Sequence, residues 1–309
     1  MASVTVHEKP GEYGLVAGLA SYLLWGFLPL LFDALEPAGS ITIVANRTIW
    51  SVLFVGAILI VGGRTKEVRA VLRDGKAVRT MALSALVLGL NWLVFIYAVE
   101  SGQLLEGSFG YFINPLVSVA VGMALLGEKL NRWQAVSVGI AVIGIGIQAA
   151  GLGNIPFIAL TLAFSFAIYG YLRKTAQASS ATGLFVETLL MSPLAIGYLT
   201  YGLIRDGGLG AQGEPTIMVL LMLTGPATAI PLLLFAYAAQ RLRLATIGML
   251  QYLAPSIAFL LAIFVMGEHL NTTRLVSFGF IWFSLAVYTA DSIIRRRRAR
   301  VPVPPPSTA

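Results

Sequence analysis

Gly127-Glu128-Lys129-Leu130-Asn131 returns 140 residues later as Gly267-Glu268-His269-Leu270-Asn271, and this repetition decides the fold. Over thirteen residues from the start of each copy, seven are identical, where chance gives about one or two. Further matches at the same offset lie upstream: Phe95, Tyr97, Ala98 and Pro115 correspond to Phe235, Tyr237, Ala238 and Pro255. Both copies lie in very apolar sequence. The chain is therefore predicted to be a duplicated membrane unit, an arrangement typical of transporters.

The composition places the chain in a lipid bilayer. Of its 309 residues, 57% are hydrophobic and 11% are charged, whereas about 25% of the residues of soluble proteins are charged. The mean hydropathy is +0.83. There is no cysteine, which excludes disulfides, thiol nucleophiles and thiolate metal sites. His7 and His269 have no His, Asp or Glu at a spacing typical of a metal site, so we expect neither a metal nor another cofactor.

Ten apolar segments are each close to the roughly 20 residues needed to cross a bilayer. They are continuously apolar and do not alternate, so they are predicted to be helices and not barrel strands. The fold class is therefore an all-α membrane protein with ten transmembrane helices. The expected spans are residues 13–32, 40–61, 80–99, 104–126, 133–150, 156–171, 182–201, 217–238, 246–266 and 273–291.

Loop charges predict the direction of the spans, because cytoplasmic loops are enriched in Lys and Arg. With the N-terminus inside, 18 of the 21 basic residues are cytoplasmic, while Arg205 and Arg274 are outside and Arg47 lies within a span. We therefore expect a multi-pass protein of the cytoplasmic (inner) membrane with both termini in the cytoplasm. This distribution also explains the net charge of +7. Arginines 295–298 are interpreted as an anchor on anionic lipids and not as a nucleic-acid site.

Five spans per copy is an odd number, so the second copy must cross the membrane upside down. This predicts an inverted-topology repeat with a pseudo-two-fold axis in the membrane plane. The expected organisation is a cytoplasmic N-terminus at 1–12, a first repeat at 13–150, a second repeat at 156–291 and a basic, proline-rich disordered cytoplasmic tail at 292–309.

Small and acidic residues near the span ends lead to further expectations. Gly139, Gly144 and Gly146 in the fifth span are expected to allow close helix packing. A homodimer through the fifth and tenth spans is left open. Glu128 and Glu268 stand at span ends, where we expect them to terminate helices at the membrane interface.

Several motifs resemble those of known transporters. Trp25-Gly26-Phe27-Leu28-Pro29 looks like the WG..P signature of EamA-type transporters, in the drug/metabolite transporter superfamily. More specific pieces resemble the RarD subfamily, known as chloramphenicol-sensitivity proteins; they begin at Asn46, Asn91, Gly110, Gly127, Leu162, Val186, Arg241 and Gln251. The likeness covers about residues 10–292, with the motifs in order. It implies ten helices with cytoplasmic termini and two EamA domains around a central cavity, but it supplies no substrate. At Asn46 relatives are expected to have His, so no proton-handling imidazole is carried over there.

Charged residues inside spans are costly, so Arg47, Glu106 and Glu187 are site hypotheses. Arg47 and Glu187 are repeat partners. However, helix rise places Arg47 roughly 10 Å below the outer surface and leaves on the order of 12 Å between the two depths. Partners at a shared depth are Glu106 for Arg47, and Arg173, Lys174, Arg241 or Arg243 for Glu187. We interpret these as outer and inner gate pairs; the alternatives are permanent structural pairs or snorkelling side chains.

Uncharged candidate residues lie near the midplane of the membrane. Polar and aromatic side chains that could face a substrate are Asn91, Tyr111, Asn114, Tyr169, Gln251 and Tyr252. Pro115 and Pro255 are equivalent and could kink their helices and free carbonyls for binding, or simply shape the packing. Trp25 and Trp92 could stack on an aromatic or cationic ligand, with packing or an interfacial belt as the alternative.

These features predict a secondary-active transporter that exports a small metabolite or drug-like compound by alternating access. No GxxxxGK[ST] motif occurs, so energy from a gradient is expected, with a proton or cation as the coupling ion. An enzyme is not expected, because no polar cluster of His, Asp or Ser marks a membrane face, and no catalytic residue is assigned. A non-transporting sensor or partner protein is the alternative, although the longest loop is only about residues 62–79.

Overall fold

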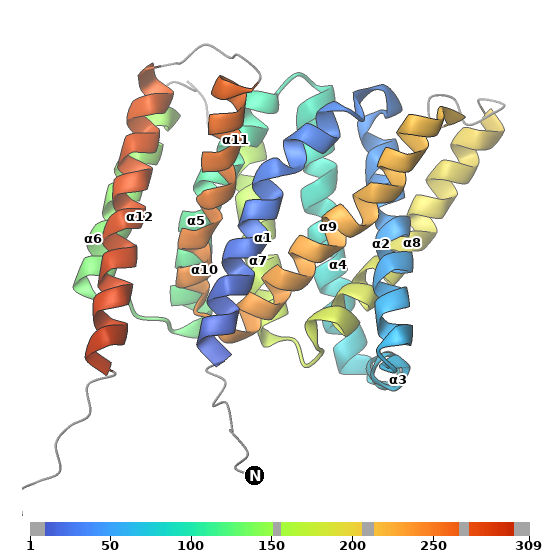
Figure 1. Cartoon of the computed structure of the whole chain (residues 1–309), viewed down its shortest axis with the longest axis horizontal. Coiled ribbons are helices and arrows are strands. Elements are labelled where there is room, and N and C mark those ends of the chain that lie inside the picture. Colours follow the sequence, from blue (N-terminus) through green and yellow to red (C-terminus); the bar gives the residue numbers. More distant parts are fainter. Residues whose placement is uncertain (1–9, 151–155, 206–212, 266–271, 300–309) are drawn as a thin grey trace, which may run out of the picture.

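The computed structural model describes residues 10–150, 156–205, 213–265 and 272–299. Within this part of the chain all regular structure is helical, and the helices form one bundle with their axes running between its two ends (Figure 1). In chain order the elements are α1 (Pro10–Asp33), η1 (Glu36–Ala38), α2 (Ser40–Val61), α3 (Thr65–Arg73), α4 (Gly75–Glu100), α5 (Leu104–Leu126), α6 (Arg132–Ala149), α7 (Phe157–Thr175), α8 (Ser180–Arg205), α9 (Pro215–Arg241), α10 (Leu244–Gln251), α11 (Leu253–Phe264) and α12 (Thr272–Ala299).

The expected membrane class and helix order are confirmed. Among the described residues, nine segments are long and apolar enough to cross a membrane, with α10 and α11 forming one span. The tenth expected span is α7, which is 19 residues long and has Arg173 and Lys174 in its last turn, two charges that lower its apolar character. The predicted bounds of α2 and α5 match the structure, whereas α12 continues past residue 291 to Ala299. The tail predicted to be disordered at 292–309 is helical up to Ala299, because α12 continues into it. Its remainder at 300–309 and the link at 151–155 lie outside the described residues.

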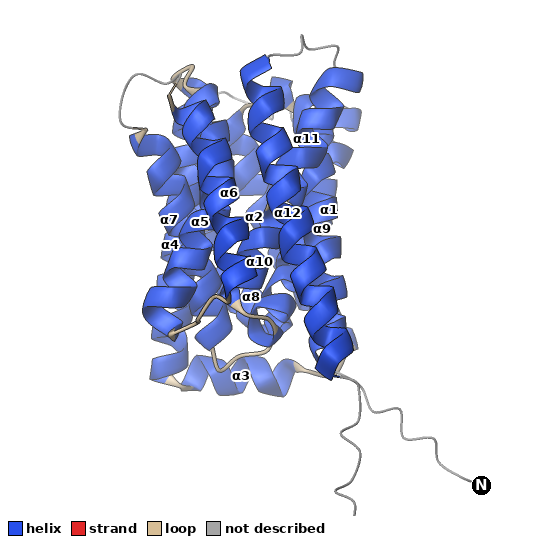
Figure 2. Ribbon diagram, turned by 90° about the vertical axis from the view of Figure 1, so that its left-hand side faces the viewer, coloured by secondary structure: helices blue, strands red, loops and turns tan. Residues whose placement is uncertain are grey.

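The segment predicted as the longest loop contains a short helix. α3 lies across the end of the bundle (Figure 2). Its Glu67 forms an ion pair with Arg64 at 2.7 Å and accepts a hydrogen bond from Thr182 Oγ1 of α8 at 3.0 Å. The hydrogen bonds from Arg64 lower the pKa of the Glu67 carboxyl to about 2. The carboxylate therefore stays charged at neutral pH and ties α3 to the start of α8.

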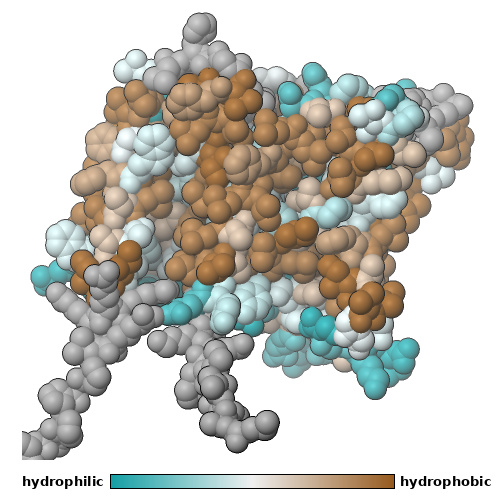
Figure 3. Space-filling model, in the orientation of Figure 1, coloured by the Kyte–Doolittle hydropathy of each residue, from teal (hydrophilic) through white to brown (hydrophobic). Residues whose placement is uncertain are grey.

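The two ends of the bundle differ in charge. The end where α1 begins and α12 finishes, at the bottom of Figure 1, also carries α3. We call it the basic end, because these described cations lie there: Lys66, Arg69, Arg73, Arg173, Lys174, Arg241, Arg243 and Arg295. We call the other end the opposite end. Between them, apolar side chains cover much of the surface seen in Figure 3, as a membrane-embedded protein requires.

Reciprocal hydrogen bonds between α6 and α12 confirm the inverted repeat. Ser137 Oγ donates to the Ser284 carbonyl at 2.7 Å, and Ser277 Oγ donates to the Gly144 carbonyl at 2.7 Å. Ser137 and Ser277 are repeat partners, and so are Gly144 and Ser284. The same bond is thus made twice around a local two-fold axis, as the 140-residue offset predicts.

Each half of the chain completes the packing of the other half. α1 packs on α9 and α11, and its repeat partner α7 packs on α4 and α5. The equivalent helices α2 and α8 pack together, as do α5 with α10 and α6 with α12. The main buried apolar cluster correspondingly draws side chains from both halves, including Tyr22, Val55, Tyr169 and Phe235. The middle of the bundle is therefore lined by both repeats.

The predicted role of the glycines in the fifth span is right at one position and wrong at two. A Cβ added to Gly144 would lie 2.9 Å from the Phe280 Cβ and 3.0 Å from the Ser277 carbonyl oxygen. Around Gly139 and Gly146 there is open space. Only Gly144 lies on the face of α6 that crosses α12, because the helical period turns the other two away.

Gly144→Ala is therefore expected to destabilise the protein, by about 1–3 kcal/mol, because α12 must move away from α6. Gly146→Ala, on the same helix, is the matched control and should be neutral or slightly stabilising. The midpoint of thermal unfolding of the purified protein measures both. Equal midpoints for the two variants would contradict this crossing geometry.

The two equivalent prolines behave differently. α5 continues without interruption through Pro115, whereas the equivalent segment is broken at Tyr252, before Pro255, into α10 and α11. Near the break α10 approaches α5 closely: a Cβ on Gly248 would lie 2.7 Å from the Pro115 carbonyl oxygen. Of the two positions at which a kink was considered, the helix is interrupted in the second repeat alone.

Candidate functional site

An ion pair is enclosed in the bundle near the basic end. Arg173, in the last turn of α7, holds its Nη1 3.2 Å from Glu187 Oε1 of α8, and both side chains are 0% exposed. Arg173 Nη2 also donates to the Ser180 carbonyl at 3.2 Å, and the Tyr169 hydroxyl donates to Glu187 Oε2 at 3.5 Å. Arg173 is one of the four partners expected for Glu187 from its depth. The pair joins two consecutive helices near the basic end.

Other cations hold helix ends together beside this pair. Lys174 Nζ donates to the carbonyls of Ala239, at 3.3 Å, and Leu242 at the end of α9. Arg243 Nη2 donates to the Lys129 carbonyl at 2.6 Å. Cations at the carbonyl ends of helices are favourable because the helix dipole is negative there. These bonds close the basic end around the Arg173–Glu187 pair.

Two carboxylates predicted for other roles cap helices of the opposite repeat. Glu128 accepts from the backbone N–H groups of Leu244, at 2.7 Å, and Ala245, at 2.9 Å, at the start of α10. Glu106 accepts from the Ile158 N–H at 2.8 Å, at the start of α7. A carboxylate suits this place because the first N–H groups of a helix lack partners and the dipole is positive there. Glu128 thus anchors the start of another helix, not simply the end of its own.

Glu128→Gln is expected to lower stability by about 1 kcal/mol, because an amide offers one acceptor oxygen to two N–H groups and carries no charge. Thermal unfolding measures the change. Glu214→Gln is the comparison, since Glu214 caps the Ile217 N–H of α9 at 2.7 Å from an exposed position; its effect should be smaller. A larger effect at Glu214 would contradict the account. Glu268, the repeat partner of Glu128, lies outside the described residues.

Aromatic rings from α1, α7 and α9 pack together inside the bundle. Trp25 of α1 lies 5.7 Å from Phe166 of α7 and 5.8 Å from Phe235 of α9, between ring centroids. Tyr169 stacks on Phe235 at 5.7 Å, with an interplanar angle of 13°. Trp25 therefore has a packing role in this state, and Phe166 and Phe235 are functional candidates that the sequence analysis missed. The repeat match at Phe235 was the signal that could have identified it.

Arg47 lies near the opposite end, on α2, without the partner expected for it. Its guanidinium carbon is 3.8 Å from the centroid of the Trp92 ring of α4. Its Nε is buried and has no hydrogen-bond partner. Among the described residues no carboxylate comes within ion-pair distance of Arg47, so the expected pair with Glu106 is not formed in this state and its gating role stays a prediction. Tyr111 of α5 lies within electrostatic range of Arg47 and is 45% exposed.

Some of the remaining polar candidates have hydrogen-bond partners within the protein, and others have buried atoms without one. Asn91 Nδ2 donates to the Leu162 carbonyl and to Ser165 Oγ, each at 2.9 Å, and so joins α4 to α7. Gln251 Oε1 accepts from Ser118 Oγ at 3.3 Å. Buried atoms without a hydrogen-bond partner are Asn114 Oδ1 and the Tyr252 hydroxyl. Thus Tyr169 and Glu187 gather with Arg173 in one place, and Arg47, Trp92 and Tyr111 gather in another.

Repeat partners differ in burial, and the partner that lies towards the basic end is the more buried of the two. Glu187 is fully buried towards the basic end, whereas its partner Arg47 is half-buried towards the opposite end. Gln251 is 5% exposed, whereas its partner Tyr111 is 45% exposed. Likewise α7 packs on α9, while their partners α1 and α4 scarcely touch. The two-fold symmetry is therefore broken: the compared repeat partners are more deeply buried towards the basic end than towards the opposite end.

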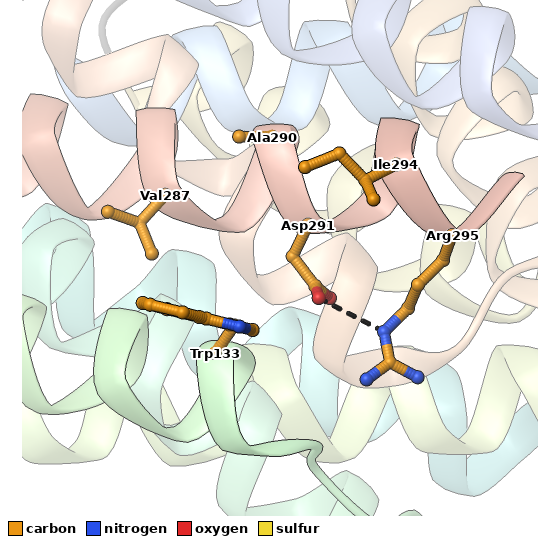
Figure 4. Close-up of a pocket in the computed structure, with 6 residues that line it drawn as sticks. All are labelled: Trp133, Val287, Ala290, Asp291, Ile294 and Arg295. Carbon is orange, nitrogen blue, oxygen red and sulfur yellow. Dashed lines mark hydrogen bonds and ion pairs between the residues drawn. The ribbon is translucent and has the colours of Figure 1, made fainter. Parts of the chain in front are cut away.

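A separate surface hollow lies at the basic end between α6 and α12 (Figure 4). It has a volume of about 720 Å³ and is lined by Trp133, Val287, Ala290, Asp291, Ile294 and Arg295. Asp291 accepts from Arg295 Nε at 3.0 Å and from Asn131 Nδ2 at 2.7 Å. Its carboxylate is therefore satisfied by the protein itself. Among the described residues no group of His, Cys, Asp and Glu could hold a metal ion.

Known proteins resemble the chain over nearly its full length. The model of the EamA-like transporter family matches residues 12–148. Protein RarD of Salmonella typhimurium is 42% identical over 292 residues, which cover 94% of this chain and 99% of that protein. The uncharacterized transporter YojE of Bacillus subtilis is 40% identical, with 93% and 97% covered, and the chloramphenicol-sensitive protein RarD of Pseudomonas aeruginosa is 28% identical, with 93% and 97% covered. One solved crystal structure has the same fold, with a TM-score of 0.70, 18% identity and 91% and 99% covered.

Proposed function

Because the chain belongs to the EamA-like transporter family, as a transporter of the RarD type, we propose that it exports a small metabolite or drug-like compound by alternating access. The broken symmetry between the repeats carries this proposal. In inverted-repeat transporters the two halves exchange conformations as access alternates around a fixed site. In each state of such a mechanism, the contacts that close the protein form at one end only.

The charge distribution supports an orientation for this cycle. We infer from the positive-inside rule that the basic end faces the cytoplasm of a bacterial cell and that both termini lie on that side of the inner membrane. The described state is then closed to the cytoplasm by Arg173–Glu187 and the neighbouring helix-end contacts. It is open towards the outside at Arg47 and Tyr111. For an exporter this is the state that releases substrate.

Glu187 is the better candidate for coupling to a proton. Glu106 bonds to the backbone of α7, and that bond holds a helix end in place. Glu187 bonds to the side chain of Arg173, which can change partners when helices move. Glu187→Gln, which keeps the size of the side chain, is expected to remove the dependence of transport on a pH gradient across proteoliposomes.

Metabolite profiling tests the transport proposal without a known substrate. Cells that overproduce the protein should release at least one compound into the medium and contain less of it inside. Cells with Arg173→Met at equal membrane levels are the control, because an unpaired Glu187 should disturb the closed state. If a wide panel shows no compound that changes with the wild-type protein, the proposal fails and the sensor or partner function is favoured.

A further inference from the structure

Arg47 is a positive charge inside the bundle, and among the described residues no carboxylate neutralises it. It lies about seven residues, or roughly 10 Å of helix rise, from the start of α2. The other two ionisable side chains predicted within spans are engaged elsewhere, Glu106 by the Ile158 N–H and Glu187 by Arg173. Charges in the membrane interior are normally paired or face a functional cavity. The missing partner of Arg47 is therefore a negative charge that comes from outside the described protein.

The surroundings of Arg47 leave its hydrogen-bond donors available. The Trp92 ring lies against the guanidinium at 3.8 Å, but a ring face attracts a cation without accepting its in-plane N–H bonds. Nε is buried and unbonded. Tyr111 is 45% exposed, and its ring lies 5.9 Å from that of Phe95. These side chains thus place a cation with unbonded donors beside aromatic rings.

We propose that Arg47, backed by Trp92 and flanked by Tyr111, binds the anionic group of a small organic acid with a flat apolar body. A guanidinium is a planar fork of donors that matches a carboxylate with two parallel hydrogen bonds. The aromatic rings suit the apolar body of such a ligand. A cationic ligand would be repelled by Arg47, and the two carboxylates predicted within spans are bonded elsewhere, Glu106 to the Ile158 N–H and Glu187 to Arg173. That this acid is the transported substrate rests on the proposed function; its binding does not.

Three probes of equal shape and different charge test the site: benzoate, benzamide and benzylamine. With the purified protein in lipid nanodiscs, calorimetric titration should show benzoate binding on the order of tenfold more tightly than benzamide, with benzylamine weakest. Equal affinities, or a preference for benzylamine, would overturn the proposal. This ranking uses the unmodified protein, so it does not depend on the folding of a variant.

Substitutions then test whether Arg47 is the charge that binds the anion. Arg47→Gln should remove the preference for benzoate over benzamide, and Arg47→Lys should keep part of it, because the charge remains but the fork is lost. Arg69→Gln is the matched control, since it removes the same charge from an exposed position on α3. If Arg69→Gln weakened benzoate binding as much as Arg47→Gln, the net charge and not the site would explain the preference.

The failure of this proposal can be told apart from the failure of the transport proposal. Benzoate binding that depends on Arg47, together with an empty metabolite profile, would refute transport and leave the anion site standing. Export of a compound by the wild-type protein, together with equal benzoate binding by the wild type and Arg47→Gln, would support transport and overturn the anion site.

Discussion

Arg173→Met is expected to destabilise the protein by about 3–5 kcal/mol, because it leaves the Glu187 carboxylate buried without its partner. Both side chains of the pair are 0% exposed, so water cannot take the place of the guanidinium. Denaturant unfolding of the purified protein in detergent measures the loss. Glu187→Leu should lower stability by a similar amount, since it leaves a buried guanidinium.

The double variant Arg173→Met with Glu187→Leu is the decisive control. Removing both charges removes the desolvation penalty as well as the attraction, so most of the stability should return. Gly183→Ala is an independent probe, because a Cβ there would overlap the Arg173 guanidinium and push it away from Glu187. Additive losses in the double variant would mean that the two residues are not coupled, and the gate proposal would lose its structural basis.

Gly225→Ala is expected to destabilise the protein by roughly 1–3 kcal/mol or more, because it forces apart the closest crossing of α2 and α9. A Cβ on Gly225 would overlap the Trp50 Cβ and lie 2.5 Å from the Trp50 carbonyl carbon. Backbone atoms cannot rotate away as the end of a flexible side chain can. At the same crossing Ser51 Oγ donates to the Gly225 carbonyl at 3.2 Å, and that bond would be strained too.

Gly197→Ala on α8 provides the matched control, since no atom lies within 4 Å of a Cβ added there. It should keep or slightly raise stability, because alanine favours the helix over glycine by up to about 1 kcal/mol. Thermal unfolding and the yield of folded protein measure both variants. Equal behaviour at Gly225 and Gly197 would show that the crossing is looser than described.

The topology could be predicted from the sequence, because the internal repeat and the distribution of basic residues indicate it directly. The 140-residue offset predicted that α6 and α12 are equivalent, and the reciprocal bonds of Ser137 and Ser277 confirm it. The depth of a residue in the membrane could also be predicted, because the rise per residue of a helix is constant. This is why Arg173 was among the expected partners of Glu187: the two lie at similar depth on consecutive helices joined by a short connection.

Lateral neighbours could not be predicted in the same way. Arg47 and Glu106 share a depth, but α2 packs on α8 and α9 and not closely on α5, so the two side chains do not meet. Glu106 and Glu128 cap helices that are distant in the chain, and nothing in their own segments indicates which helix start lies beside them. Likewise, the period of α6 does not reveal which glycine faces α12. These features depend on how the helices are arranged around each other.

The gating roles of Arg47 and Glu187 stay predictions, and a labelling experiment tests the account most directly. The chain has no cysteine, so Tyr111→Cys can be labelled with a membrane-impermeant maleimide from either side of the membrane. Ser101→Cys at the opposite end and Thr65→Cys at the basic end, both exposed, calibrate the two sides. The account predicts that Tyr111→Cys reacts in spheroplasts, from the side of Ser101, and is protected in inverted vesicles. Labelling that is as fast in inverted vesicles, from the side of Thr65, would contradict a bundle closed at its basic end.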